Sequence, residues 1–237
     1  MPHAMATLFQ VLLLAATVPN ALANLNFIQL PVHTNAVCLD GTPAGYYWKP
    51  ATPALAPPLS TSSTSNHPPS PSNVWIIHLQ GGGWCYDAAS CKHRCGTPAS
   101  PNTANPLCSS TTFPPSKALG GIFWAHNPTL RSSNKVFVPY CTSDGHMGDS
   151  TFEGWQFRGQ RVIQSVLTEL VDTHGLGSGL AGTDTLIFGG ASAGGKSCSG
   201  VSIHSIRSLH AFLFLSLQLF FLLLRMNGAF GLYRSIH

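Results

Sequence analysis

One short segment, LIFGGASAGGKS at 186–197, contains two overlapping patterns that could carry out chemistry. Residues 190–194 read G-x-S-x-G, the sharp strand-to-helix turn that presents a nucleophilic serine, here Ser192. Residues 190–197 also read G-x-x-x-x-G-K-S, a loop whose backbone amides bind phosphate. Both patterns need a strand before the segment and a helix after it, so the rest of the chain must decide between them.

The lack of acidic residues after Asp184 and the presence of a second glycine-rich segment favour the nucleophilic serine over the phosphate-binding loop. A phosphate-binding loop relies on an acidic residue at the end of a later strand to hold Mg²⁺, and no Asp or Glu follows Asp184. A nucleophilic serine instead needs backbone donors for the oxyanion. The amide after Ser192 belongs to Ala193, and Gly82 and Gly83 follow an apolar run. We therefore predict that Ser192 is the nucleophile and that these three amides form the oxyanion hole.

The acid and the base that normally activate such a serine are not identifiable in this chain. An α/β-hydrolase places both of them after the serine, with the acid before the histidine. No acid follows Ser192, and upstream acids such as Asp144, Asp149 and Asp172 precede it, which breaks this order. The later histidines lie in no recognisable motif; they are His204, His210 and His237. Because a serine without a base is a weak nucleophile, we expect slow ester hydrolysis or none.

The elements that must position these residues follow from hydrophobic periodicity. Strands are expected within 24–49 and at 74–79, 135–140 and 185–188. A helix is expected from about 157 to Gly175, because apolar residues recur there at three- and four-residue spacing. The glycine pattern at 177–182 follows a helix and precedes a strand, which is the reverse of a dinucleotide-binding turn, so it is assigned to a loop. This alternation predicts an α/β fold.

Composition limits the class of protein and its partners. The chain has 237 residues, enough for one sizeable domain, with 44% hydrophobic and only 8% charged residues. The net charge is +4 without a basic run, so no nucleic-acid partner is expected. Residues 50–73 are rich in Pro, Ser and Thr and favour a long loop between two strands over a domain linker.

The two ends of the chain differ from its middle. An apolar run at 8–18 precedes Ala21-Leu22-Ala23, which predicts a signal peptide over 1–23; a buried helix is the alternative. Residues 211–224 read AFLFLSLQLFFLLL. This run is shorter than the roughly 20 residues of a membrane span, so membrane association is not expected.

Seven cysteines fit an oxidising compartment, where most of them would pair and one would be left over. Four lie between 85 and 108, but their spacings do not match those of zinc sites. We therefore predict no metal site, and no pattern in the chain calls for a cofactor.

Four motifs together resemble the pectin acetylesterases. HLQGGGWC at 78–85 is similar to their HLEGGGWC, and YC at 140 with GD at 148 is similar to YCDG…TGD. FRG at 157 resembles the (Y/F)RG that opens a helix, and GASAGG at 190–195 resembles the GCSAGG turn. The Notum carboxylesterases of the same superfamily share the shorter GGW and SAGG cores. The resemblance covers roughly residues 30–196.

The resemblance implies a secreted serine esterase of α/β-hydrolase fold that deacetylates pectin in a cell wall. It assigns Ser192 as nucleophile, Ala193, Gly82 and Gly83 as oxyanion donors, and Trp84 to the acyl pocket, although Trp84 could equally pack in the core. It also implies two disulfides, Cys38–Cys141 and Cys85–Cys91. Alternatives are a Notum-like lipid deacylase, a non-catalytic truncated secreted protein, and a nucleotide-binding P-loop protein.

The chain departs from the family at several places, among them a Pro/Ser/Thr-rich insert longer than usual and Lys196-Ser197 after the serine turn. Gln80 stands where the family has Glu, and after Lys196 the sequence changes to the hydrophobic tail 199–237. We therefore predict a partial α/β-hydrolase domain, with a mostly parallel sheet, over 24–198, and expect its C-terminal part to be missing or replaced. A sheet without its second half would leave one edge strand exposed.

Overall fold

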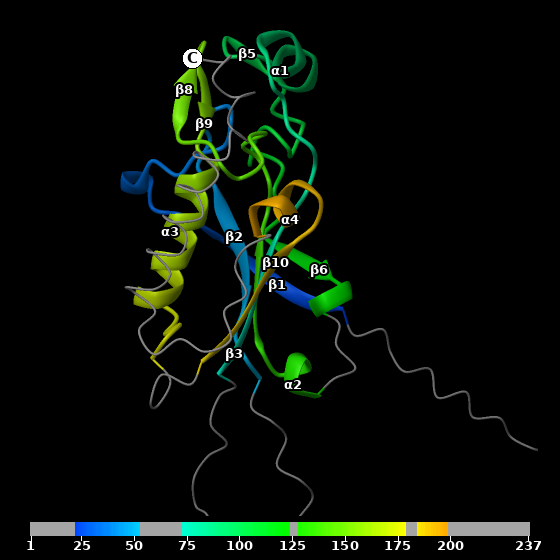
Figure 1. Cartoon of the computed structure of the whole chain (residues 1–237), viewed down its shortest axis with the longest axis vertical. Helices are drawn as coiled ribbons and strands as arrows, with labels where there is room; N and C mark the ends of the chain where they lie inside the picture. The colour runs from blue at the N-terminus through cyan, green and yellow to red at the C-terminus, as the bar shows by residue number, and fades with distance from the viewer. Residues whose placement is uncertain (1–21, 53–72, 124–127, 179–183, 199–237) are drawn as a thin grey trace, which may run out of the picture.

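A six-stranded mixed sheet lies at the centre of this computed structural model, which describes residues 22–52, 73–123, 128–178 and 184–198 (Figure 1). The strand order is β10-β3-β7-β2-β1-β6. Strand β3 pairs in parallel with both β10 and β7, whereas β2, β1 and β6 continue the sheet by antiparallel pairing. The bounds are β1 Ala23–Gln29, β2 Gly45–Lys49, β3 Val74–Leu79, β6 Ser116–Leu119, β7 Asn134–Val138 and β10 Thr185–Gly190.

Helices and two small hairpins surround the sheet. The helices are α1 Ala88–Cys95, α2 Pro128–Arg131, α3 Gly159–Asp172 and α4 Ala193–Cys198, with 3₁₀ turns η1 Val32–Thr34 and η2 Gly121–Phe123. The hairpins pair β4 Gly96–Thr97 with β5 Ser100–Pro101, and β8 Ser150–Phe152 with β9 Trp155–Phe157. The predicted α/β class is confirmed, as are the strands expected at 74–79, 135–140 and 185–188 and the helix expected from about 157.

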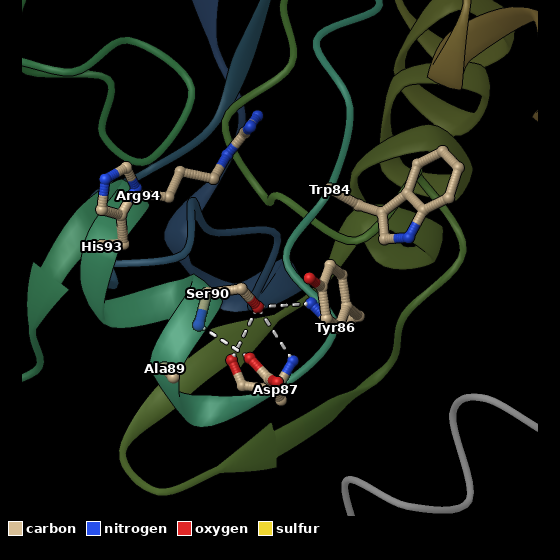
Figure 2. Close-up of a pocket in the computed structure, with 7 residues that line it drawn as sticks. All are labelled: Trp84, Tyr86, Asp87, Ala89, Ser90, His93 and Arg94. Atoms are coloured by element: carbon tan, nitrogen blue, oxygen red, sulfur yellow. Dashed lines mark hydrogen bonds between the residues drawn. The ribbon is translucent and has the colours of Figure 1, made fainter.

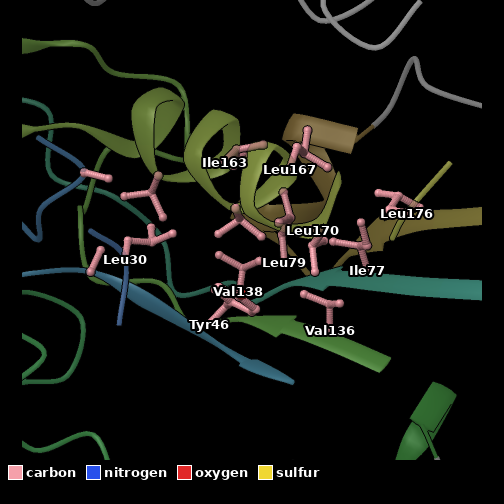
Figure 3. Close-up of a cluster of buried hydrophobic side chains, with 14 of the residues drawn as sticks. Leu30, Tyr46, Ile77, Leu79, Val136, Val138, Ile163, Leu167, Leu170 and Leu176 are labelled. Carbon is pink, nitrogen blue, oxygen red and sulfur yellow. The ribbon is translucent and has the colours of Figure 1, made fainter. Parts of the chain in front are cut away.

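Helix α3 covers one face of the sheet and closes the main core (Figure 3). Its apolar residues recur every three or four positions, so they form a single stripe that faces the strands. The stripe consists of Val162, Ile163, Val166, Leu167 and Leu170, all buried against β2, β3 and β7. The opposite face of the sheet holds a smaller cluster around Tyr47, Ile76 and Phe137.

The three parallel strands direct their carboxyl ends to one edge of the sheet. Strand β3 leads into the glycines at 81–83, β7 into the loop at 139–149, and β10 into the segment that precedes α4. Ligand sites in α/β sheets form at the carboxyl ends of the strands, so this edge is where a site is expected. Within the described ranges β10 is the outermost strand on its side of the sheet.

Several sequence-based expectations fall on other parts of the chain. The predicted signal peptide lies almost wholly outside the described residues, although β1 begins at Ala23. Residues 53–72 of the Pro/Ser/Thr-rich segment, which joins β2 to β3, and the tail 199–237 with its apolar run at 211–224 also lie outside them. None of the helices in the described ranges has the length and apolarity that a membrane span requires.

Candidate active site

A tight turn between β10 and α4 presents Ser192 at the carboxyl edge of the sheet. Only Ala191 and Ser192 separate the last residue of the strand from the first residue of the helix. Ser192 is exposed and has a φ of 51°, in the left-handed region that residues with a Cβ seldom adopt. A non-glycine residue held in this conformation is typical of functional turns.

Glycines allow the turn to pack directly against β3. A Cβ at position 194 would overlap the Leu79 carbonyl oxygen, so only glycine lets α4 approach the strand this closely. The Ala191 amide donates a hydrogen bond to the same oxygen at 3.1 Å. The turn that carries Ser192 is therefore attached to the end of β3.

The triple-glycine turn, Gly81–Gly83, lies beside Ser192. A Cβ at Gly81 would overlap the Ala191 carbonyl oxygen and would stand 2.9 Å from the Ser192 Cβ. Gly83 has a φ of 68°, so the backbone here also takes a left-handed conformation. Two segments that are more than a hundred residues apart in sequence thus meet at one point.

Three backbone amides at this point are unpaired within the described ranges. No described atom accepts a hydrogen bond from the amides of Gly82, Gly83 or Ala193. Protein amides are normally paired with an acceptor when they are not exposed to water. Adjacent unpaired donors of this kind are the groups from which an oxyanion hole is built.

An open hollow of about 430 Å³, drawn in Figure 2, lies along the segment that leads from the triple-glycine turn into α1. Trp84 and Tyr86 stand on the extended segment that leads to α1, and they are 42% and 58% exposed. The lining otherwise consists of Ala89 and the polar side chains of Asp87, Ser90, His93 and Arg94. Trp84 therefore lies at the surface, not in the core, and the Lys196 ammonium lies 4.3 Å from its ring centre.

A buried Asp144 holds the loop after β7 against the start of α3. Its carboxylate accepts hydrogen bonds from the Thr142 hydroxyl at 2.5 Å and from the amides of His146, Gly148 and Gly159. Burial raises the pKa of this carboxyl to about 6, although the four donors oppose the shift. Asp144 is thus a structural anchor, not a free acid.

The Nε2 atom of His146 is not free to act as a general base. Its Nε2 lies 2.9 Å from the Gln80 carbonyl oxygen, which can only accept, so Nε2 carries the proton. Burial lowers the pKa of His146 to about 4, so the ring is neutral at pH 7. Tyr140 packs against the ring at 4.6 Å. This histidine therefore braces the β3 end of the site.

Comparison with known proteins identifies the family. The family profile of the pectinacetylesterases matches residues 16–212. This chain belongs to the pectinacetylesterase family. The resemblance predicted from four motifs is confirmed, and the family match extends past both ends of the predicted range of 30–196.

Relatives in this family include the animal Notum proteins. The chain is 33% identical to the palmitoleoyl-protein carboxylesterase NOTUM of Mus musculus over 174 residues, and 36% identical to notum1' of Xenopus laevis over 171 residues. It spans 29% of the length of each. A crystal structure of the Drosophila Wnt deacylase Notum superposes with a TM-score of 0.56 and 30% identity, covering 73% of this chain and 44% of that one.

The turn between β10 and α4 is poorly suited to hold nucleotide phosphate. A phosphate-binding loop needs several residues between strand and helix to surround the phosphate, whereas two residues separate β10 from α4. The Ser197 hydroxyl, which would contact Mg²⁺ in a P-loop, is buried and bonds to the backbone carbonyls of Gly145 and Ala193. The geometry therefore argues against the nucleotide alternative.

The described part of this family member does not supply a base for Ser192. No described side chain hydrogen-bonds to its hydroxyl, and Asp149 is occupied by ion pairs with Arg158 and Arg161. Gln80, which replaces the family's Glu, uses its side-chain oxygen to accept the Tyr140 amide at 3.2 Å. Asp149 and Gln80 are thus engaged in other contacts, and neither bonds to Ser192.

Three disulfides brace the loops around the site. They are Cys38–Cys141, Cys85–Cys91 and Cys95–Cys108; the first two are the pairs that the resemblance implies. The four cysteines between 85 and 108 are thus all paired, and in the described ranges no three His, Cys, Asp or Glu side chains group as metal ligands would.

Sequence reasoning missed one residue that touches the candidate oxyanion turn. Arg94 donates from Nη2 to the Gly82 carbonyl oxygen at 2.5 Å. Neither the type nor the spacing of Arg94 singles it out, because α1 is polar and carries no apolar stripe. Only the folding of α1 against the triple-glycine turn shows the contact.

Proposed function

We propose that this chain is a secreted serine carboxylesterase that removes acetyl groups from pectin or a similar cell-wall polysaccharide. The observation that carries the proposal is the meeting of Ser192 with the triple-glycine turn and its unpaired amides. The Ser192 oxygen attacks the acetyl carbon, and the amides of Ala193 and Gly83 stabilise the oxyanion. The proton lost by the Ser192 hydroxyl is carried by water, because the described residues supply no base, and it goes to the departing sugar oxygen. Water then attacks the acetyl-serine, which releases acetate and restores the serine hydroxyl.

The hollow beside the site favours a sugar chain over a long acyl chain. An acyl chain needs an enclosed apolar cavity, whereas this hollow is open and four of its seven lining residues are polar. Exposed aromatic rings such as Trp84 and Tyr86 supply flat apolar faces of the kind that can pack against sugar rings. A Notum-like lipid deacylase remains the second candidate because of the 33% identity to that relative.

The disulfides support an extracellular location. Three pairs in a chain of this size are typical of proteins that fold in an oxidising compartment. Together with the signal peptide proposed for residues 1–23, they favour secretion into the cell wall.

Labelling and turnover of Ser192 test the proposal. The full chain is treated with a fluorophosphonate probe, and acetate release is measured from acetylated pectin and from a palmitoleoyl ester. We expect labelling of the wild type but not of Ser192→Ala, and unchanged labelling of Lys196→Ala, which would abolish a nucleotide site. Labelling that survives Ser192→Ala would contradict the serine assignment.

Turnover separates the remaining alternatives. Because the described residues supply no base, we expect acetate release far slower than that of a full-length relative. Faster release from the palmitoleoyl ester would favour the lipid deacylase. Labelling without any acetate release would favour a non-catalytic secreted protein that retains the oxyanion site.

A further inference from the structure

Arg94 contacts the backbone of the candidate oxyanion turn from the side of α1. Its Nη2 donates to the Gly82 carbonyl oxygen at 2.5 Å, and its Nη1 lies 3.7 Å from where a Gly83 Cβ would stand. Figure 2 shows Arg94 and Trp84 on opposite sides of the extended segment. Trp84 lies on the side of the turn at Ala191–Ser192, called the elbow from here on, since Lys196 of α4 covers its ring.

We propose that Arg94 is a positioning residue that orients the Gly82–Gly83 peptide so that the Gly83 N–H faces Ser192. The inference rests on the proposed function, because it assigns how one donor of the oxyanion hole is aimed. In a trans peptide the C=O of one residue and the N–H of the next point in opposite directions, and the described chain contains no cis peptide. A carbonyl held toward α1 therefore directs the following N–H toward the elbow.

The glycine turn needs such a contact because its own backbone does not fix the peptide. Gly82 and Gly83 have φ values of 156° and 68°, and glycine occupies both halves of the φ range at similar cost. A flip of the peptide between them would exchange the positions of the C=O and the N–H and present an oxygen to the oxyanion. The charged hydrogen bond from Arg94 disfavours that flip.

The guanidinium is itself held at a second point. Arg94 Nε donates to the Ser143 hydroxyl at 2.8 Å, and that hydroxyl donates to the Leu107 carbonyl oxygen at 2.8 Å. The Arg94 carbonyl accepts a hydrogen bond from the Asn105 side chain at 3.0 Å. Two disulfides, Cys85–Cys91 and Cys95–Cys108, fasten α1 on either side of Arg94. The donor is thus fixed by both its side chain and its helix.

Nuclear Overhauser effects test the orientation without any need for activity. In the full chain with labelled glycine amides, we expect a cross-peak between the Gly83 amide proton and the Ser192 β-protons. Arg94→Gln removes the guanidinium and its charged hydrogen bond to the Gly82 carbonyl oxygen. It should abolish this cross-peak and leave the cross-peaks between β10 and β3 unchanged. A cross-peak that persists in Arg94→Gln, or that is absent from the wild type, would overturn the inference.

The rate of Ser192 labelling by the fluorophosphonate gives the chemical readout. Loss of one oxyanion donor costs about 10²–10³ in rate in other hydrolases, so Arg94→Gln should slow labelling at least tenfold. Arg94→Lys restores one charged donor and should recover part of the rate. The matched control Arg161→Gln removes an exposed ion pair with Asp149 and should leave the rate unchanged.

Ser143→Ala covers the case in which Arg94→Gln does not fold. This change keeps the charge of Arg94 but removes the partner of its Nε, so we expect a smaller loss of labelling rate and only a modest fall in melting temperature. Equal rates in the wild type, Ser143→Ala and Arg94→Gln would refute the positioning role. A wild-type chain with no labelling at all would contradict the proposed function, while the cross-peak would still decide the role of Arg94.

Discussion

At position 81 a hydrogen atom is the largest substituent that the site accepts. Any Cβ there would overlap the Ala191 carbonyl oxygen and stand 2.9 Å from the Ser192 Cβ, closer than carbon atoms approach without strain. The nearest atom belongs to the Ala191 backbone, so no flexible side chain can move to make room. The packing of these two segments thus depends on the absence of one methyl group.

Gly81→Ala should therefore separate the triple-glycine turn from the elbow. We expect unfolding free energy to fall by roughly 1–3 kcal/mol, as for other overpacked sites, and labelling of Ser192 to fall at least tenfold. Gly189→Ala is the matched control, since nothing lies within 4 Å of a Cβ at that strand position. Equal effects of the two substitutions on labelling would contradict the close approach.

At the scale of elements, the loop between β7 and α3 buries two titratable groups that respond to pH in opposite directions. The pKa of Asp144 is raised to about 6 and that of His146 is lowered to about 4, in both cases chiefly by burial. Between pH 4 and 6 the folded state holds a proton on Asp144, and the unfolded state holds one on His146. The pH dependences of these two contributions to stability therefore nearly cancel in this range.

His146→Gln should expose the contribution of Asp144 alone. A carboxyl with a raised pKa stabilises the fold at low pH, and this stability is lost as pH rises from about 4 to 6. The difference between the ordinary pKa and about 6 corresponds to roughly 3 kcal/mol. Urea denaturation from pH 4 to 6.5 should show that decline in the variant and little change in the wild type. Parallel curves would contradict the opposing shifts.

Elements with a strong hydrophobic pattern could be predicted from the sequence, and polar ones could not. The run VWIIHL gives β3 because both faces of this strand are buried, and the apolar stripe of the segment 159–172 gives α3 because one face of that helix is buried. Helix α1 reads AASCKHRC and forms through an Asp87 capping box and two disulfides. Its location, and hence the contact of Arg94 with Gly82, depends on tertiary structure.

The candidate site shows the same division. Ser192, Ala193 and the glycines at 82–83 follow from local motifs, because the chemistry fixes both residue type and spacing. The sheet order could not be predicted, since the antiparallel pairing of β2 with β7 joins segments that are about ninety residues apart. The three-disulfide map likewise needed the fold, because spacing alone leaves the connectivity open.

At the scale of the whole molecule, one disulfide joins distant parts of the chain. Cys38–Cys141 closes a loop of 103 residues and links the segment after η1 to the segment after β7, next to the site. Cys85–Cys91 closes only 6 residues. Since a cross-link stabilises by restricting the unfolded chain, the longer loop should contribute more.

Paired cysteine-to-serine variants measure this difference. Loop-closure entropy gives about 4.7 kcal/mol for a loop of roughly 100 residues and about 2 kcal/mol for the short one. Removing Cys38–Cys141 should therefore lower the free energy of unfolding in guanidinium roughly twice as much as removing Cys85–Cys91. An equal or smaller loss for the long loop would contradict the expectation.

The left-handed backbone conformation at Ser192 makes any residue that carries a hydroxyl less stable there than glycine. With φ at 51°, a side chain there costs roughly 1 kcal/mol that glycine would avoid. We expect Ser192→Gly to melt at a higher temperature than the wild type, and Ser192→Ala, which keeps its Cβ, not to. The most stable variant of this fold would then lack the hydroxyl. A serine at this position lowers stability, and only use of its hydroxyl would maintain that cost.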